Sequence, residues 1–306
     1  MDFSGAVLNR PWTLTAERFH SMVKLARATS LAAGAPSAAL RRAAIAQGNR
    51  PGSARIAVLP LLGTLSQRLH PMDFFGETSL EAFGATFNQV LADPSIETIV
   101  IEVDSPGGSV YGVAELAALI FAARGKKRIV AIANTLAASA AYWIGSAAGE
   151  LSCTPTGEVG SIGVLAVHEE FARAEDAAGL KVTLISAGKY KTEGNEHEPL
   201  GDTARAALQA RVNAYYGMFV RAVARHRGVS QAGVVEGFGE GRVVGASDAL
   251  KMGMVDRVET KDEMLKRLAM SPARATIPRA RAENFGIEKE RAAHLRLRDA
   301  LARGGP

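Results

Sequence analysis

Three short segments of this sequence carry residue types that could do chemistry together: a serine, a pair of glycines and a lysine. The serine is Ser139, which follows an alanine-rich stretch and precedes a predicted helix. A serine that enters a helix after such a turn can project its Oγ into a cleft, with the N–H of Ala140 beside it to stabilise an oxyanion. The alternative is an ordinary N-cap, whose side-chain oxygen accepts a hydrogen bond from the helix.

The glycine pair, Gly107 and Gly108, lies in the sequence DSPGGS at residues 104–109, between a predicted strand and a predicted helix. Without Cβ atoms, these residues would let backbone N–H groups face outward near the positive end of the helix, where they could bind a phosphate or an oxyanion. A tight strand-to-helix turn is the alternative. The sequence has neither GxGxxG here nor GxxxxGK[ST] anywhere, so nucleotide binding has no support.

The lysine candidates, Lys189 and Lys191, lie in the sequence SAGKYKT, which follows a predicted strand. A serine nucleophile needs a base, but there is no GxSxG elbow and no HExxH motif. A desolvated lysine can serve as the base if burial lowers its pKa from about 10.4 toward about 7 or 8. An exposed surface lysine is the alternative. The six histidines are scattered: His20, His70, His168, His197, His226 and His294.

The elements that must position these residues alternate between strand and helix from about residue 54 onward, which indicates an α/β fold of repeated βαβ units. Continuous apolar runs such as TIVIEV favour strands that are covered on both faces. Strands are predicted at 55–62, 98–103, 128–133, 163–167 and 181–185. Helices are predicted at 79–92, 110–124, 139–148, 169–178 and 202–227.

The longest uncharged run, residues 129–149, is the one candidate for a membrane span. Alanine is its commonest residue, it contains Asn134 and several hydroxyl side chains, and it offers little of the leucine and phenylalanine that drive insertion. We interpret it as a buried strand, turn and helix. We therefore expect no transmembrane anchor, and the opening MDFSGAVLNRPW lacks the features of a signal peptide.

The composition excludes several classes of protein. Of the 306 residues, 47% are apolar and 22% are charged, which is typical of a globular chain rather than a disordered one. The single cysteine, Cys153, excludes an intrachain disulfide framework, and no Cys/His spacing fits zinc. We therefore expect no metal and no cofactor, and a reducing, cytoplasmic location.

The basic charge is concentrated at the two ends. Residues 1–52 hold seven Lys/Arg against two acids, residues 271–306 hold eight against four, and the middle carries a net charge of −4. Because no aromatic residues are interleaved with these charges as a base-stacking surface requires, no nucleic-acid partner is expected. We predict an N-terminal arm and linker (1–52) with an amphipathic stretch at 15–32, a central domain (53–270), and a basic tail (271–306) with a charged helix at 287–303.

The order and spacing of several motifs resemble the signal peptide peptidase A family of Ser/Lys peptidases, whose members share the fold of Clp protease subunits and crotonases. The resemblance covers residues 54–268. It depends on EVDSPGGSVYG, TLAASAAYWIGSAA, TGEVGSIGV, SAGKYK and GRVVGASDALKMGMVDRV. It implies an α/β Clp protease/crotonase-like fold and a serine endopeptidase.

The resemblance also implies a role for individual residues. Ser139 falls on the nucleophile, and Lys191, rather than Lys189, falls on the general base. Gly108 and Ala140 fall on the oxyanion donors, and Ser161 falls on a hydroxyl that orients the lysine amine. The sequence departs from the family pattern where Asp104 replaces a common asparagine and where Ala140 and Ala141 replace glycines. The alanine methyl groups should narrow the cleft.

The opening LNRPWTLTAERFHSMVKL resembles the phage head maturation proteases of the protein C type, which belong to the same family. This resemblance implies action on capsid, scaffold or portal proteins, inside an assembling prohead, by a cyclic homo-oligomer. Three alternatives stay open: a cellular peptidase that degrades signal peptides, a crotonase-type acyl-CoA enzyme, and a non-catalytic capsid scaffold. For a peptidase, the uncharged surroundings of Ser139 predict small or medium apolar side chains beside the cut bond, in an extended substrate that adds as a strand beside Gly107 and Gly108.

Overall fold

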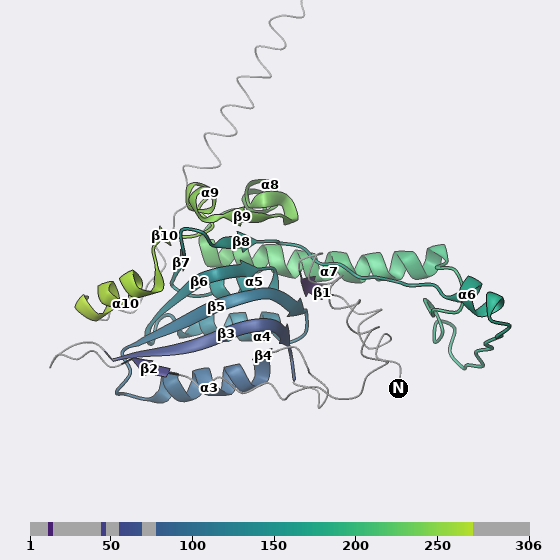
Figure 1. Cartoon of the computed structure of the whole chain (residues 1–306), viewed down its shortest axis with the longest axis horizontal. Coiled ribbons are helices and arrows are strands. Elements are labelled where there is room, and N and C mark those ends of the chain that lie inside the picture. Colours follow the sequence, from purple (N-terminus) through teal and green to yellow (C-terminus); the bar gives the residue numbers. More distant parts are fainter. Residues whose placement is uncertain (1–11, 15–43, 47–54, 69–77, 272–306) are drawn as a thin grey trace, which may run out of the picture.

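The protein, described here by a computed structural model, is built around one large mixed sheet (Figure 1). The structure describes residues 12–14, 44–46, 55–68 and 78–271. The main path of the sheet runs β10-β7-β6-β5-β3-β2, with β1, β4, β8 and β9 joined beside it. The strands are β1 (Trp12–Leu14), β2 (Ala44–Ala46), β3 (Ile56–Ser66), β4 (Thr78–Ser79), β5 (Thr98–Ser109), β6 (Arg128–Ala138), β7 (Glu150–Cys153), β8 (Glu158–Gly160), β9 (Val243–Gly245) and β10 (Arg257–Val258).

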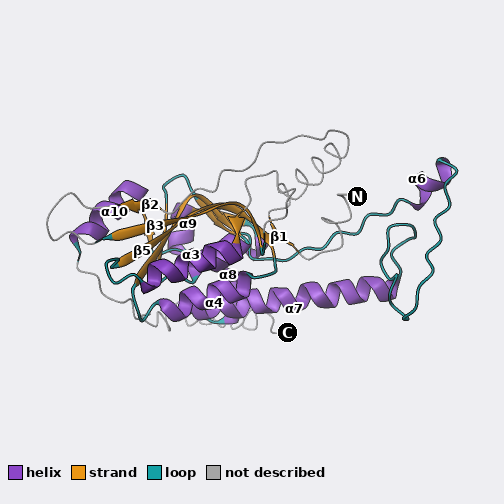
Figure 2. Ribbon diagram, turned by 90° about the horizontal axis from the view of Figure 1, so that it is seen from below, coloured by secondary structure: helices purple, strands orange, loops and turns teal. Residues whose placement is uncertain are grey.

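The helices cover both faces of this sheet (Figure 2). They are α3 (Leu80–Ala92), α4 (Val113–Ala123), α5 (Ala140–Ser146), α6 (Ala172–Ala177), α7 (Asp202–Arg227), α8 (Gln231–Gly237), the 3₁₀ turn η1 (Gly239–Gly241), α9 (Ala246–Lys251) and α10 (Lys261–Met270). α3, α4, α5 and the end of α7 pack on one face, and α10 packs on the other through Met264 and Leu268.

The central strands are parallel, as their continuous apolar sequences predict. β5 pairs in parallel with β3 on one side and with β6 on the other, and β6 pairs in parallel with β7. Alternate residues of β5 face opposite layers: Ile99 and Ile101 lie in the larger core, while Val100 lies in the smaller core under α10. The predicted α/β fold is therefore confirmed, and the run 129–149 is a strand and a buried helix, as interpreted from its composition.

Two predicted turns are strands in the structure. The sequence DSPGGS does not leave the sheet: it forms the second half of β5, and helix α4 begins only at Val113 after Gly112. Residues 134–138, expected as an alanine-rich turn, form the end of β6. Both segments stay in the sheet because they find new partners there, Leu65 of β3 for Gly108 and Gly160 of β8 for Ala138.

The strands predicted at 163–167 and 181–185 are not formed. Residues 164–201 leave the body of the protein as an extended arm with one short helix, α6 (Figures 1 and 2). A strand needs a neighbour that accepts its backbone hydrogen bonds, and none of the described residues forms such a neighbour beside residues 181–185. Helix α7 follows the arm back, and with the exception of Ala204 its buried residues begin only at Phe219.

The segment from α8 to α10, for which the sequence predicted no helices or strands, adds two short strands to the sheet. β9 pairs with β8, and β10 pairs with β7. α10 starts with a capping box between Thr260 and Glu263. No helix within the described ranges is long and apolar enough to cross a membrane. The amphipathic stretch at 15–32 and the charged helix predicted at 287–303 lie outside the described residues.

Candidate active site

Ser139 stands at the junction of β6 and α5, in a backbone conformation that a serine rarely adopts. Its φ of 56° and ψ of −120° lie outside the ordinary helix and strand regions. The conformation is held in place because the Ser139 N–H donates to the carbonyl of Gly160 at 2.7 Å and the Ser139 carbonyl accepts from Trp143 at 2.9 Å. The strain is therefore built in by the β6–β8 pairing on one side and by the helix on the other.

The Ser139 side chain does not cap the helix that it precedes. Its Oγ makes no hydrogen bond to the first turn of α5, and its nearest partner is the carbonyl of Gly163 at 3.5 Å. Ser79 and Ser230 are the contrast, because each has an extended backbone and accepts a backbone N–H of the helix that follows. The N-cap alternative for Ser139 is thus contradicted, because the hydroxyl does not stabilise the start of the helix.

Helix α5 holds Ser139 rigidly because all seven of its residues are buried. The Arg124 side chain ends the helix by donating to three carbonyls, those of Ser146, Ala147 and Ala148, at 3.0, 2.8 and 2.5 Å. Burial lowers the pKa of Arg124 to about 10, so the guanidinium still carries its charge at neutral pH. The Tyr142 hydroxyl donates to the carbonyl of Met254 at 2.9 Å and ties the middle of α5 to the segment after α9.

The glycine pair lies at the end of β5, the strand next to β6. Gly107 has a φ of 98°, which disfavours any other residue. A Cβ on Gly108 would lie 1.8 Å from the carbonyl oxygen of Leu65, because β3 passes directly against it. Ser105 braces the segment: its Oγ donates to the carbonyl of Gly63 at 2.6 Å and accepts from the N–H of Gly107 at 3.1 Å. Sequence reasoning missed Ser105, although its place inside the motif was a signal.

Ser161 comes close to Ser139 through the short strand β8. Ala138 and Gly160 are partners in the β6–β8 ladder, so the residues that follow them, Ser139 and Ser161, leave the same end of neighbouring strands. Ser161 also has a positive φ, 52°, and its N–H donates to the carbonyl of Arg242 at 2.7 Å. Two serines with left-handed φ values therefore lie beside each other at this edge of the sheet.

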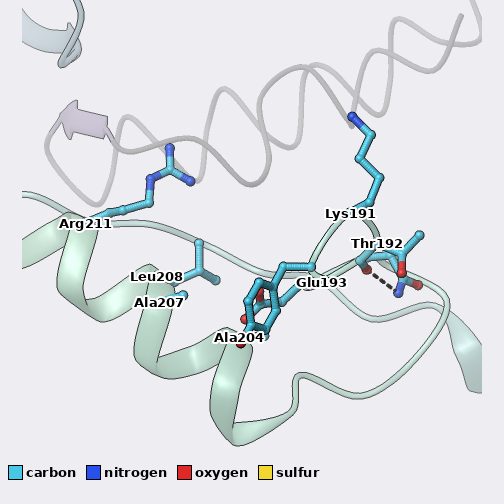
Figure 3. A pocket seen from close by; sticks show the side chains of 10 residues that line it. Lys191, Thr192, Glu193, Ala204, Ala207, Leu208 and Arg211 are labelled. Atoms are coloured by element: carbon cyan, nitrogen blue, oxygen red, sulfur yellow. Dashed lines mark hydrogen bonds between the residues drawn. The ribbon is translucent and has the colours of Figure 1, made fainter. Parts of the chain in front are cut away.

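Lys191 is not brought to this edge within one chain. It belongs to the arm at the outer end of α7, which lies away from α5 in Figure 1 and away from the sheet in Figure 2. Its side chain is exposed and extends away from α7, beside a cavity of about 420 Å³ that the arm encloses with the start of that helix (Figure 3). The structure thus collects Gly108, Ser139, Ala140 and Ser161 at one edge of the sheet and leaves Lys191 outside.

Two other nucleophile candidates fail on their surroundings. Burial raises the pKa of the Cys153 thiol to about 12, so no thiolate is available at neutral pH. Ser146 and His226 form a pair, with 3.0 Å between Oγ and Nδ1, but both side chains are buried. Burial, reinforced by Arg124, lowers the pKa of His226 to about 3, and the pair acts as a support between α5 and α7. Within the described ranges, no cluster of His, Cys, Asp and Glu could hold a metal ion.

The arrangement can perform acyl transfer, since it joins a strained, uncapped serine to a glycine-lined strand end and a helix N-terminus. Comparison with known proteins agrees with this chemistry. Residues 122–273 match the model of peptidase family S49. This part of the chain is a peptidase S49 domain. The resemblance seen in the sequence motifs is confirmed, and the S49 match includes Ser139, Ser161 and Lys191.

The chain is similar to two phage proteins. It is 34% identical over 204 residues to the capsid assembly protease C of Escherichia phage lambda, covering 66% of this chain and 46% of that protein. It is also 34% identical over 212 residues to the head-tail preconnector protein GP5 of Enterobacteria phage P21, covering 64% of this chain and 42% of that protein. The chain therefore matches less than half the length of either relative.

Among solved structures, a ClpP1 variant from Listeria monocytogenes is similar in backbone to this protein. The TM-score is 0.44 at 15% sequence identity, and the match covers 68% of this chain and 94% of the ClpP1 chain.

Proposed function

We propose that this protein is a serine endopeptidase with Ser139 as nucleophile and Lys191 as general base, acting in the assembly of phage capsids. The observation that carries the proposal is the state of Ser139: a buried, strained serine whose Oγ is not used to cap its helix. Strain of this kind is kept at functional sites because the surrounding structure over-determines it. The S49 match and the two phage relatives support the same activity.

The proposed reaction follows from the chemistry of the groups. The neutral Nζ of Lys191 accepts the proton of Ser139 Oγ while the oxygen attacks the peptide carbonyl. The N–H groups of Gly108 and Ala140 stabilise the oxyanion, and the Lys191 ammonium then gives its proton to the leaving amine. In the second half, the neutral lysine takes a proton from water while the water oxygen attacks the serine ester, and the resulting ammonium returns a proton to Ser139 Oγ as the ester bond breaks. Ser161 orients the lysine amine.

We propose that the serine and the lysine come from different subunits. The arm that carries Lys191 exposes several large apolar side chains: Ile185 is 95% exposed, Leu180 60% and Tyr190 56%. Apolar side chains gathered on a surface are typical of an interface with another protein. Residues 181–185 have a strand-like sequence but pair with no strand in the part of the chain that the structure describes. Helix α7, at 26 residues, is about 39 Å long and carries the arm that far from the body. A cyclic homo-oligomer would bury the arm on the neighbour.

The substrate class is part of the same proposal. The residues that follow Ser139 in the sequence, from Ala140 to Trp143, are buried and uncharged. Such surroundings favour small or medium apolar side chains beside the cut bond. The phage relatives suggest that the substrates are capsid, scaffold or portal proteins, and that the protein acts in the cytoplasm or within an assembling prohead.

The test of the activity is a serine-directed probe, such as a fluorophosphonate, together with a peptide library. Label should appear on Ser139 of the wild-type protein and be absent from Ser139→Ala. Lys191→Ala should lose both labelling and hydrolysis, whereas Lys189→Ala, two residues away in the same exposed loop, should keep both. Acyl-CoA turnover that survives Ser139→Ala would instead favour a crotonase-type enzyme, and loss of activity in Lys189→Ala alone would contradict the assignment of the base.

A further inference from the structure

The short strand β1, from the N-terminal part of the chain, pairs with the glycine segment at the end of β5. The pairing is antiparallel and places Trp12 opposite Ser109, Thr13 opposite Gly108, and Leu14 opposite Gly107. This contact joins segments almost a hundred residues apart in the sequence. It puts the N-terminal segment directly on a residue proposed to stabilise the oxyanion.

The other pairings of β5 decide on which edge β1 lies. A strand has two hydrogen-bonding edges. On the first edge, Gly107 pairs with Thr64 of β3 and Gly108 pairs with Leu65. β1 must therefore occupy the second edge, which further back along β5 belongs to β6.

β6 leaves that second edge just before the glycines. The last β5–β6 partners are Ser105 and Ala137, and β6 then continues through Ala138 to Ser139. The edge of Gly107 and Gly108 is thereby opened on the side of β6, the strand that ends at Ser139. β1 fills this position.

An extended peptide substrate would need the same position. Addition of a strand to a free sheet edge lets backbone hydrogen bonds supply affinity with little demand on sequence. To reach both the Ser139 hydroxyl and the N–H of Gly108, the scissile segment has to run along the second edge of β5. A peptide and β1 cannot occupy that edge at the same time.

We propose that the N-terminal segment of this protein occupies the substrate-binding edge of its own active site and competes with peptide substrates. This second edge of β5 can bind an extended peptide, and in this structure residues 12–14 of the same chain are bound there, antiparallel to β5. This inference depends on the proposed function, because only a peptidase would bind its substrate at this edge. The contact between β1 and β5 can nevertheless be tested without catalysis. Substrate binding then requires that β1 leaves.

The test is a reversible disulfide between two facing positions, Trp12→Cys combined with Ser109→Cys. Directly opposite residues of an antiparallel pair are close enough for such a bond. The one native cysteine, Cys153, is buried, which keeps it from competing. Mass spectrometry after oxidation should find the 12–109 disulfide, and the protein should keep monomer mobility on a non-reducing gel. Failure to form the bond, or a bond only between chains, would overturn the proposal.

Binding is measured in the Ser139→Ala background, so that the readout does not depend on hydrolysis. The probe is a fluorescein-labelled peptide with the sequence LNRPWTLTAERFH, which copies residues 8–20. Oxidation of the cysteine pair should weaken its binding at least tenfold, and reductant should restore it. The same peptide with N-methylated backbone nitrogens is the control and should bind poorly to the reduced protein. Equal binding by the oxidised and reduced forms would show that β1 does not compete.

The same cysteine pair in the Ser139 protein separates this inference from the proposed function. Hydrolysis of a peptide substrate should fall on oxidation and return on reduction, and the two single-cysteine variants should show no such response. If neither form hydrolyses any peptide and Ser139 takes no fluorophosphonate, the proposed peptidase activity fails. The binding measurement would then still decide whether the N-terminal segment occupies this edge.

Discussion

The two parts of the proposed catalytic site differ in how the fold treats them. Ser139 is fully buried, has strained dihedral angles and is fixed by Gly160 and by helix α5. Lys191 is exposed, on an arm whose residues 181–191 are all exposed. The difference teaches that one chain can fix the proposed nucleophile in place, whereas the proposed base is held near it only if a second subunit packs against the arm, as we propose.

The largest expected effect comes from separating the two parts. Ser139→Ala and Lys191→Ala should each lower peptide hydrolysis about a thousandfold or more, and the double variant should be no worse, because residues that act as one unit are not additive. If each site takes its serine and its lysine from different subunits, an equal mixture that exchanges subunits regains about a quarter of the activity, since both residues are intact at that fraction of the interfaces. No recovery in a mixture shown to exchange would place both residues in one chain.

The arm itself gives the next largest effect. Ile185→Asp changes a side chain that is 95% exposed in the single chain, so folding of the body should be unaffected. If a neighbouring subunit covers it, the buried carboxylate should weaken association and lower activity about tenfold or more, because an unpaired charge is costly to desolvate. Light scattering and specific activity, measured over a dilution series, check this. Leu250→Asp, an exposed leucine on α9, is the matched control and should have no such effect.

The preorganised part predicts an effect on folding instead. Gly108→Ala would place a methyl group 1.8 Å from the Leu65 carbonyl oxygen, inside the sheet, where the backbone cannot easily move. Overpacking of this kind should destabilise the protein by about 3 kcal/mol and remove activity. Gly125→Ala, with no atom near the added methyl group, should change little. Urea unfolding compares the two, and equal stability would show that the strand end is looser than described.

The smallest expected effect is a pH dependence of stability that comes from His226, the residue of α7 that contacts Ser146 of α5. The pKa of His226 is lowered to about 3 in the folded protein, first by burial and then by Arg124, from about 6.5 in an unfolded chain. Below pH 6.5 the unfolded chain binds a proton that the folded protein does not, so stability falls as the pH drops from 6.5 toward 3. The loss at pH 5 should be about 2 kcal/mol. His226→Gln should reduce that slope, and an unchanged slope in urea unfolding at pH 7 and 5 would assign it to other groups.

Local sequence was sufficient to predict the elements that are defined by their own residues. The continuous apolar runs of β3, β5 and β6 and the ends of α7 were predictable because burial and helix-stopping residues act within a short window. The two predicted turns, at 104–109 and 134–138, were wrong because these segments pair with strands that are distant in the sequence. Nothing near Gly108 or Ala138 in the sequence reports that Leu65 and Gly160 come alongside them as strand partners.

The sequence by itself determined the α/β fold, the S49 family motifs and the chemical types needed for acyl transfer, because these depend on residue identity and local order. Only the tertiary structure decided what those residues can reach. The ladder with β8 gives Ser139 its strained backbone, the arm places Lys191 away from Ser139 of the same chain, and the edge of β5 pairs with the short strand β1. Each is a contact between segments far apart in sequence, and hydrogen-bonding edges and buried surfaces become defined only when the chain has folded.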